Sequence, residues 1–129
     1  MLIHDKPNLI SVLTTILEDC VNKNYGLSHL LLASRDGLPM ISTEGETTIP
    51  EETLAVINAT SSYHGQMILN ELKCGKIKEL FVKGDTGLLI IFPVGSDASL
   101  LGIASNDGNL RNILLEMKRT AKKLLQSLQ

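Results

Sequence analysis

The chain has 129 residues, enough for one domain with a buried core. Hydrophobic residues make up 43% and charged residues 20%, which excludes a disordered chain, and the net charge of -2 argues against general binding to nucleic acid. The longest unbroken apolar run, residues 88–92, is far shorter than the ~20 residues that a membrane span needs, and the N-terminus lacks a signal-peptide pattern, so we expect a cytoplasmic protein without direct membrane insertion.

The first part of the chain predicts a helix followed by a hairpin. Apolar residues recur at helical spacing over 7–24, and this segment begins with a proline, which suits the first turn of a helix. Residues 27–34 are expected to form a strand, and the apolar run at its centre indicates that both of its faces are covered. Asp36-Gly37 is a strong hairpin signal, so we expect a short second strand over 39–43 at a sheet edge.

A long helix is expected next. Thr48 is the predicted N-cap, and the helix extends to about Cys74, where Gly75 stops it. The apolar stripe expected to face a sheet consists of Leu54, Ile57, Ile68 and Leu72. A second apolar set lies on other faces and consists of Val56, Tyr63, Met67 and Cys74. This helix therefore carries more apolar surface than one sheet face requires.

Three strands and a helix complete the chain. The strands are expected over 77–83, 88–94 and 99–105, and the helix over 110–128. Glycine-containing turns separate the strands, which predicts an antiparallel meander. Asp107 or Asn109 is expected to cap the last helix. The basic face of this helix is interpreted as solvated, with contact to an acidic partner or a membrane surface as the alternative.

The resulting element order, α-β-β-α-β-β-β-α, predicts a single domain over residues 1–129. Strands that are apolar on both faces need helices on both faces, and three helices can supply them. We therefore predict the fold class α/β (α+β), with a five-stranded, mostly antiparallel sheet between helices.

The centre of the long helix is rich in small residues, namely Ala59, Ser61, Ser62 and Gly65. A glycine inside a helix costs about 1 kcal/mol relative to alanine, so the close approach of another element should offset it. Two interpretations remain open: tight packing of the helix on its own sheet, or a helix–helix contact across a homodimer. The strand over 77–83 is expected at a sheet edge, where its apolar residues invite pairing with a second copy.

Motifs for catalysis are missing from the sequence. There is no P-loop and no nucleophile elbow, and His4, His29 and His64 lack the spacing of a metal site. Cys20 and Cys74 lie in apolar helical patterns, so we expect reduced, buried thiols. We expect no catalytic residue, no metal and no cofactor, and hence no enzyme. A ligand sensor or an enzyme assembled in space is the alternative, although two tyrosines and two phenylalanines are few for a ligand pocket.

Four stretches, taken in this order and at these lengths, resemble a known family. They are "LLLASRDGLPMIS", "LAVINATSSYHGQMI", "KELFVKGDTGLLIIFPV" and "LLGIASNDGNL". Together they are similar to the roadblock family, which includes roadblock-type dynein light chains and MglB-like regulators of Ras-like GTPases. The resemblance covers the chain from about Leu9 to Leu125. It implies an antiparallel sheet with one helix on one face and two on the other, and longin and profilin-like folds are the main alternatives.

The resemblance also implies a function. Roadblock proteins are scaffolds that pair through the third strand and the middle helix, and in the MglB-like branch the dimer stimulates GTP hydrolysis by a GTPase bound across the paired helices. It therefore implies a homodimer that binds and regulates a small Ras-like GTPase. The implied dimer contacts are Ala59, Ser62, Met67, Ile77, Glu79 and Phe81. The implied partner contacts are Thr60, Tyr63, His64 and Glu71.

One alternative function is a structural adaptor in a larger motor or signalling complex, without effect on GTP hydrolysis. An arginine donated to a GTPase would have to be Arg35, Arg111 or Arg119. Arg35 lies in the expected hairpin turn and is kept as a weak partner contact, because turn arginines are usually just solvated.

Overall fold

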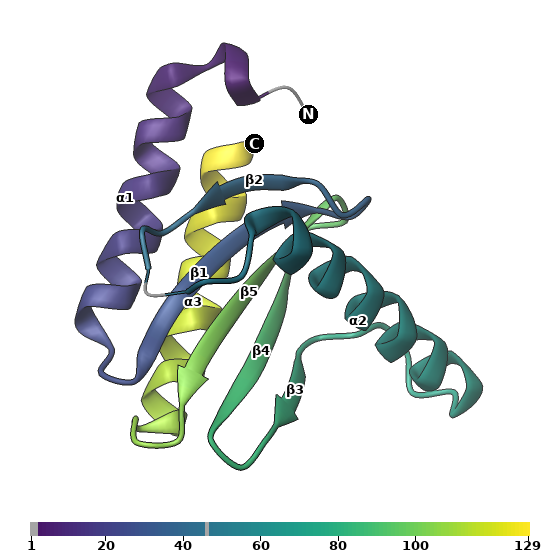
Figure 1. Ribbon diagram of the computed structural model, residues 1–129. Helices are drawn as coiled ribbons and strands as arrows, with labels where there is room; N and C mark the ends of the chain where they lie inside the picture. Colours follow the sequence, from purple (N-terminus) through teal and green to yellow (C-terminus); the bar gives the residue numbers. More distant parts are fainter. Residues whose placement is uncertain (1–2, 46) are drawn as a thin grey trace.

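The computed structural model describes residues 3–45 and 47–129, except for the side chain of His4. Its elements follow one another in the order η1 (Ile3–Asp5), α1 (Pro7–Lys23), β1 (Leu27–Ser34), β2 (Pro39–Ser42), α2 (Glu51–Glu71), β3 (Leu80–Lys83), β4 (Gly87–Val94), β5 (Ala98–Ser105) and α3 (Leu110–Leu128) (Figure 1). Apart from the short 3-10 helix η1, this is the predicted order. Within the described ranges, no helix is both long enough and apolar enough to cross a membrane.

The strands form one antiparallel sheet in the order β2-β1-β5-β4-β3. The short strands β2 and β3 are therefore its two edges, as predicted for both. Helices α1 and α3 cover one face of the sheet and α2 covers the other (Figure 1). The predicted fold class and the distribution of the helices are confirmed.

Two hydrophobic cores lie on the two faces of the sheet. The larger core packs strand residues such as Ile90 against Leu17 of α1 and Met117 of α3. The smaller core packs Ile91 against Leu54 of α2. Successive strand residues point to opposite faces of the sheet, and helices cover both faces. The sequences of the central strands are therefore continuously apolar.

Helix α2 begins at Glu51, and the prediction that Thr48 caps it is wrong. Pro50 occupies the N-cap position, and no side chain bonds to the helix terminus there. The carboxylates of Glu51 and Glu52 instead place negative charge beside the positive end of the helix dipole. Glu51 also accepts a hydrogen bond from the hydroxyl of Ser42, which ties the start of α2 to β2.

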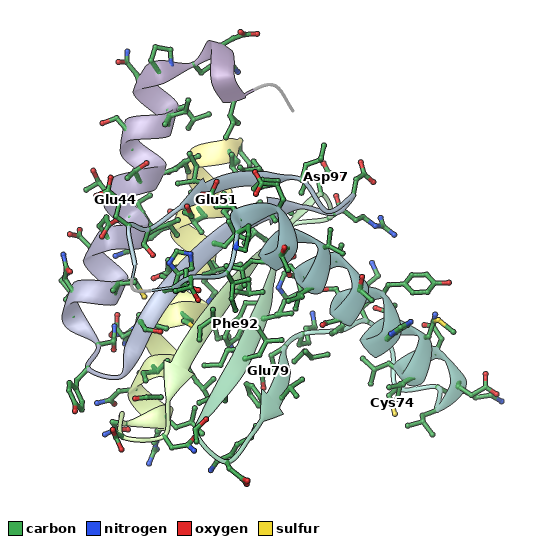
Figure 2. The ribbon with its side chains drawn as sticks, in the orientation of Figure 1. Glu44, Glu51, Cys74, Glu79, Phe92 and Asp97 are labelled. Atoms are coloured by element: carbon green, nitrogen blue, oxygen red, sulfur yellow. The ribbon has the colours of Figure 1, made fainter. Side chains whose placement is uncertain are left out.

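Helix α2 ends at Glu71, three residues before the predicted end. Lys73 has φ 56° and Gly75 has φ 87°, and these left-handed conformations reverse the chain. The prediction of a buried Cys74 is wrong, because this thiol is exposed at the end of the helix (Figure 2). Residues 70–76 are all exposed, and the C-terminal end of α2 extends past the β3 edge of the sheet (Figure 1).

Strand β3 begins at Leu80 rather than at the predicted residue 77. The side chain of Gln66 holds the preceding connection against α2: its Oε1 accepts from the amide of Ile77 and its Nε2 donates to the carbonyl of Gly75, each over 3.0 Å. If the β3–β4 pairing continued towards residue 77, Pro93 would lie opposite Lys78. Proline has no amide hydrogen and therefore fits poorly into a longer strand pairing. The residues before Leu80 therefore do not pair with β4.

The first hairpin and the last helix agree with the prediction to within a residue. Gly37 has φ 86° and donates its amide to the carbonyl of Ser34 over 3.1 Å. Asn109 caps α3, since its side-chain oxygen accepts from the amide of Asn112 over 3.2 Å. The alternative cap, Asp107, is not used.

Candidate interaction surface

Two buried hydrogen bonds fix α2 to the middle of the sheet. The hydroxyl of Ser99 donates to Oδ1 of Asn58 over 2.8 Å, and Nδ2 of Asn58 donates to the carbonyl of Ser99 over 3.2 Å. Asn58 is fully buried, as are its helical neighbours Leu54 and Ala55. Because a buried amide without partners is costly, this pair determines which side of α2 faces the sheet.

Gly65 is buried where α2 meets its connection to β3. A Cβ atom at this position would lie 2.8 Å from Cδ1 of Leu80 and 2.9 Å from Cδ1 of Ile77. Near the start of the helix, a Cβ on Gly37 would lie 3.5 Å from Cβ of Ala59. The small residues at these positions thus serve packing within the protomer. A helix–helix contact with a second copy would have to use other sides of α2.

Two apolar stripes of α2 face solvent. They consist of Val56, Tyr63 and Met67 on one side and of Ile57, Ile68 and Leu72 on the other. Their exposed fractions range from 37% for Ile57 to 65% for Leu72. Leu54 was predicted to face the sheet together with Ile57, Ile68 and Leu72. This prediction is wrong for the last three, because they are exposed. The buried side of the helix is centred instead on Asn58 and Gly65, which lie two turns apart.

Strand β3 offers apolar side chains and an open backbone edge. In the described part of the chain it pairs with β4 alone. Phe81 is 46% exposed and Val82 is 57% exposed. Sheet edges of this kind act as templates for pairing with another chain. We refer to Phe81, Val82 and the two exposed stripes of α2 together as the α2/β3 surface.

The residues implied as contacts by the family resemblance are only partly on this surface. Met67, Glu79 and Phe81 are exposed, whereas Ala59, Ser62 and Ile77 are half-buried in their own protomer. The implied partner contacts Thr60, Tyr63, His64 and Glu71 are all exposed. The rings of Tyr63 and His64 lie 5.7 Å apart.

Several exposed apolar residues of α2 lie outside the contacts that the family resemblance implies, among them Ile57, Ile68 and Leu72. Their signal was the excess of apolar residues on the long helix. That excess was visible in the sequence, but helical periodicity alone does not say which of two adjacent stripes is buried.

A groove of about 510 Å³ lies between α3 and the start of β3. Glu79 and Phe92 are among its lining residues (Figure 2), and Lys78, Lys118 and Lys122 supply positive charge. Glu79 is its one lining carboxylate, and none of the described lining residues is a histidine, cysteine or serine. The described lining of the groove therefore holds neither a serine–histidine nor a cysteine–histidine pair. No cluster of three metal-binding side chains occurs among the described residues either.

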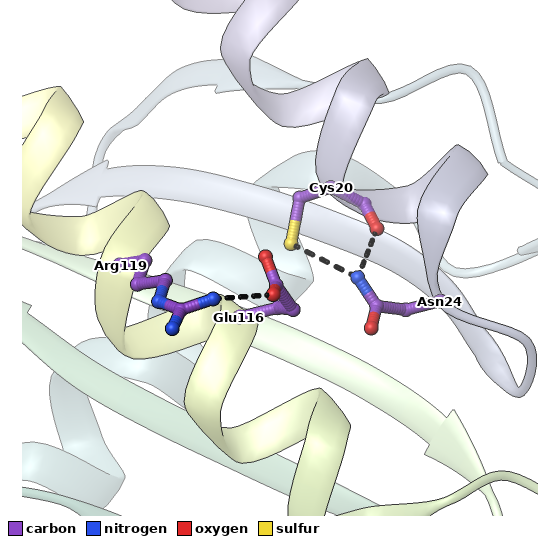
Figure 3. Close-up of polar contacts among 4 residues, drawn as sticks. All are labelled: Cys20, Asn24, Glu116 and Arg119. Carbon is purple, nitrogen blue, oxygen red and sulfur yellow. Dashed lines mark hydrogen bonds and ion pairs between the residues drawn. The ribbon is translucent and has the colours of Figure 1, made fainter.

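Cys20 is the buried thiol of α1. The side-chain amide of Asn24 donates to its carbonyl over 2.7 Å, close to the Glu116–Arg119 ion pair of α3 (Figure 3). Burial raises the pKa of the Cys20 thiol. A protonated thiol in the core is a poor nucleophile, so Cys20 is a packing residue.

His29 is the buried histidine of β1, beside the β2 edge and away from β3. Its Nδ1 lies 2.9 Å from the hydroxyl of Thr43, and its Nε2 is buried without a hydrogen-bond partner among the described residues. Burial lowers the pKa of His29, while Glu51 and Glu18 act in the opposite direction. At neutral pH the ring is therefore uncharged.

The sequence signature of the Roadblock/LC7 domain family matches residues 15–105, which is most of this α/β unit. The chain belongs to the Roadblock/LC7 domain family. This membership favours the roadblock fold over the longin and profilin-like alternatives. A comparison with curated protein sequences finds no match.

Solved roadblock structures have the same fold. A Roadblock/LC7 domain from Streptomyces avermitilis is 19% identical, with a TM-score of 0.82 over 89% of this chain and 96% of that chain. The gliding protein MglB from Thermus thermophilus is 20% identical, with a TM-score of 0.85 over 92% and 90%. An MglB structure with a tetrameric arrangement is 21% identical, with a TM-score of 0.86 over 92% and 89%. Together with the family, these likenesses support a roadblock-type regulatory or adaptor module.

Proposed function

We propose that this protein is a homodimeric, non-catalytic interaction module of the cytoplasm that binds and regulates a small Ras-like GTPase. The observation that carries the proposal is the α2/β3 surface, where exposed apolar side chains meet an open sheet edge. Exposed apolar side chains beside an unpaired strand edge favour protein–protein contacts. Membership of the Roadblock/LC7 domain family and the fold shared with MglB support the choice of partner.

The first step of the proposed function is pairing of two copies. The open edge of β3 would gain backbone hydrogen bonds from a second β3, and Phe81 and Val82 would lose contact with water. A two-fold arrangement satisfies both edges at once and leaves neither free for further growth. The exposed Ile57, Ile68 and Leu72 would be covered by the second copy of α2.

The second step is binding of the GTPase on the outward side of the paired α2 helices. Tyr63 is 64% exposed there, and a large amphipathic side chain of this kind is a common anchor in protein interfaces. Thr60, His64 and Glu71 are exposed on the same helix and supply polar contacts around it. The charged residue among them, Glu71, would select for a basic group on the partner.

Regulation in this proposal acts by rearranging the GTPase and not by donating an arginine to its phosphates. Neither α2 nor β3 contains an arginine. Arg35 lies at the tip of the first hairpin, where its backbone amide donates to the carbonyl of Asp97 over 2.8 Å. Arg119 pairs with Glu116 on α3. Stimulated hydrolysis would then come from groups of the GTPase itself, held in place by the dimer.

The same lack of an arginine on α2 and β3 also favours a second candidate, an adaptor that holds a partner without affecting hydrolysis. Single-turnover GTP hydrolysis separates the two. A GTPase that binds the dimer and hydrolyses GTP faster fits the regulator, whereas unchanged hydrolysis by the bound GTPase fits the adaptor.

Binding itself is tested with the small Ras-like GTPases of the source genome, each loaded with GDP or with a non-hydrolysable GTP analogue. One of them should bind, and Tyr63→Ala should weaken the binding by about tenfold or more. Tyr25→Ala is the matched control, since Tyr25 is 78% exposed but lies between α1 and β1. The proposal fails if no GTPase binds in either nucleotide state, or if both tyrosine variants bind equally well.

A further inference from the structure

The side chains of Glu79 and of the β3 residues alternate between the two faces of the sheet. Leu80 packs against the smaller core on the α2 side. Phe81 lies opposite Ile90, which belongs to the larger core on the α3 side. Because successive residues alternate, Val82 shares the α2 side, and Glu79 and Lys83 share the side of Phe81. The position of Glu79 in the groove beside α3 agrees with this division.

A homodimer through β3 is therefore limited to a few registers. The exposed Ile57, Ile68 and Leu72 of α2 can meet the second α2 only if both helices lie on the same face of the joined sheet. A two-fold axis perpendicular to the sheet fulfils this condition, and it pairs residues that point to the same face. Such an axis must pass beside one residue of the strand, which then lies opposite its own copy. Leu80, Phe81 and Val82 are the central candidates.

These three registers differ in which charges they bring together. An axis at Phe81 places Glu79 opposite Lys83 of the second copy, and Leu80 opposite Val82. An axis at Leu80 places the carboxylate of Glu79 opposite the ring of Phe81. An axis at Val82 places Lys83 opposite Phe81 and brings Glu79 opposite Asp85, which are like charges. Opposite charges and apolar pairs stabilise antiparallel strands, and like charges destabilise them.

From these pairings we propose that two copies of this chain join with the two-fold axis at Phe81. Glu79 and Lys83 then form two symmetric cross-strand ion pairs that flank a central Phe81–Phe81 contact. On the other face of the sheet, Leu80 and Val82 pair beside the α2 helices. The inference rests on the proposed homodimer and adds the residues that set its register.

Single cysteines read out the register directly. Residues opposite their own copy have Cα atoms about 4.5 to 5.5 Å apart, within the range that a disulfide spans. If a residue instead lies opposite a position two residues away, the Cα atoms of the residue and of its own copy are about 7 to 8 Å apart. A disulfide does not span that distance. The background is Cys74→Ser, because Cys74 is exposed, while the buried Cys20 is retained. Leu80→Cys, Phe81→Cys and Val82→Cys are each added to it and oxidised at equal concentration.

Phe81→Cys should form the covalent dimer, and Leu80→Cys and Val82→Cys should not. Preferential cross-linking of Cys at 80 or 82 would overturn the register, and so would a dimer by light scattering in which none of the three cross-links. A parent protein that is monomeric at the same concentration would overturn the proposed homodimer itself. Light scattering before oxidation thus distinguishes the two failures.

Charge reversal gives an independent test. Glu79→Lys and Lys83→Glu should each raise the dimer dissociation constant by about tenfold, because each places like charges opposite one another twice. The double variant Glu79→Lys/Lys83→Glu restores opposite charges and should return to within about threefold of the parent. Lys78→Glu is the control, since the proposed register leaves Lys78 without a charged residue opposite it. A double variant no better than the single variants would overturn the ion pair.

Discussion

Asn58 and Ser99 exchange two hydrogen bonds in the buried contact between α2 and β5. No other described side chain of α2 makes a buried side-chain hydrogen bond to the sheet. The two bonds orient the helix so that Val56, Tyr63 and Met67 lie opposite its buried side, whereas Ile57 and Ile68 lie beside it. The interaction surface therefore depends on a polar pair that lies inside the molecule.

Replacing Asn58 by alanine should lower the free energy of unfolding by about 2 to 3 kcal/mol, because it leaves the hydroxyl of buried Ser99 without its partner. Urea unfolding measures this change. Thr60→Ala on the exposed side of the same helix is the control and should change stability by less than about 0.5 kcal/mol. Equal stability of the two variants would show that the Asn58–Ser99 pair does not anchor α2.

Gly26 should be one of the least replaceable glycines of the fold. It has φ 93°, and a Cβ atom there would lie 2.6 Å from the Cα of Gly108. Gly26→Ala should therefore cost about 3 kcal/mol, from backbone strain and a clash with backbone atoms. Gly75 has φ 87° but no atom within 4 Å of its Cβ position, so Gly75→Ala should cost only about 1 kcal/mol. Thermal unfolding of both variants measures the two losses of stability. Equal losses for Gly26→Ala and Gly75→Ala would contradict the expected difference.

Stability should fall in mildly acidic solution because of His29. Burial lowers its pKa in the folded state below the ordinary 6.5, so the unfolded chain binds the proton more readily. The contribution of the neutral ring is complete above about pH 6.5 and is lost as the pH falls towards the lower pKa of the folded state. Urea unfolding at pH 7.5 and 5.5 should show a larger loss for the parent than for His29→Gln. Equal losses of stability in the parent and in His29→Gln would show that His29 does not cause the pH dependence.

The two thiols should react at different rates. Cys74 is exposed, whereas Cys20 is buried and its pKa is raised by burial. A thiol reagent at neutral pH should label Cys74 quickly and Cys20 only after unfolding. The Cys74→Ser variant should consequently show no fast phase. Fast labelling of that variant would mean that Cys20 is accessible.

Local signals in the sequence predicted most of the fold. Asp36-Gly37 predicted the first hairpin, and continuous apolar runs predicted strands covered on both faces. The start of β3 was not predictable in this way, because it depends on hydrogen bonds from Gln66 to a segment about ten residues away. Those bonds exist only after the chain has turned back along α2.

The interaction surface was predictable only in outline. The exposure of Met67, Phe81 and Tyr63 agrees with the contacts that the resemblance implied. The spacing of Ile57 and Ile68 is that of a buried stripe, so the sequence pattern predicts that both lie in the core. The buried position of polar Asn58 shifted the core-facing side of α2, and a hydropathy pattern does not reveal such a shift.

The mass of the protein in solution tests the central claim most directly. Size-exclusion chromatography with light scattering should give twice the 14.0 kDa of the chain for the parent protein. A Val82→Glu variant should give a folded monomer, because it places charge on the exposed edge of β3. A parent protein with the mass of a single chain, or a Val82→Glu variant that dimerises as well as the parent, would contradict pairing through β3.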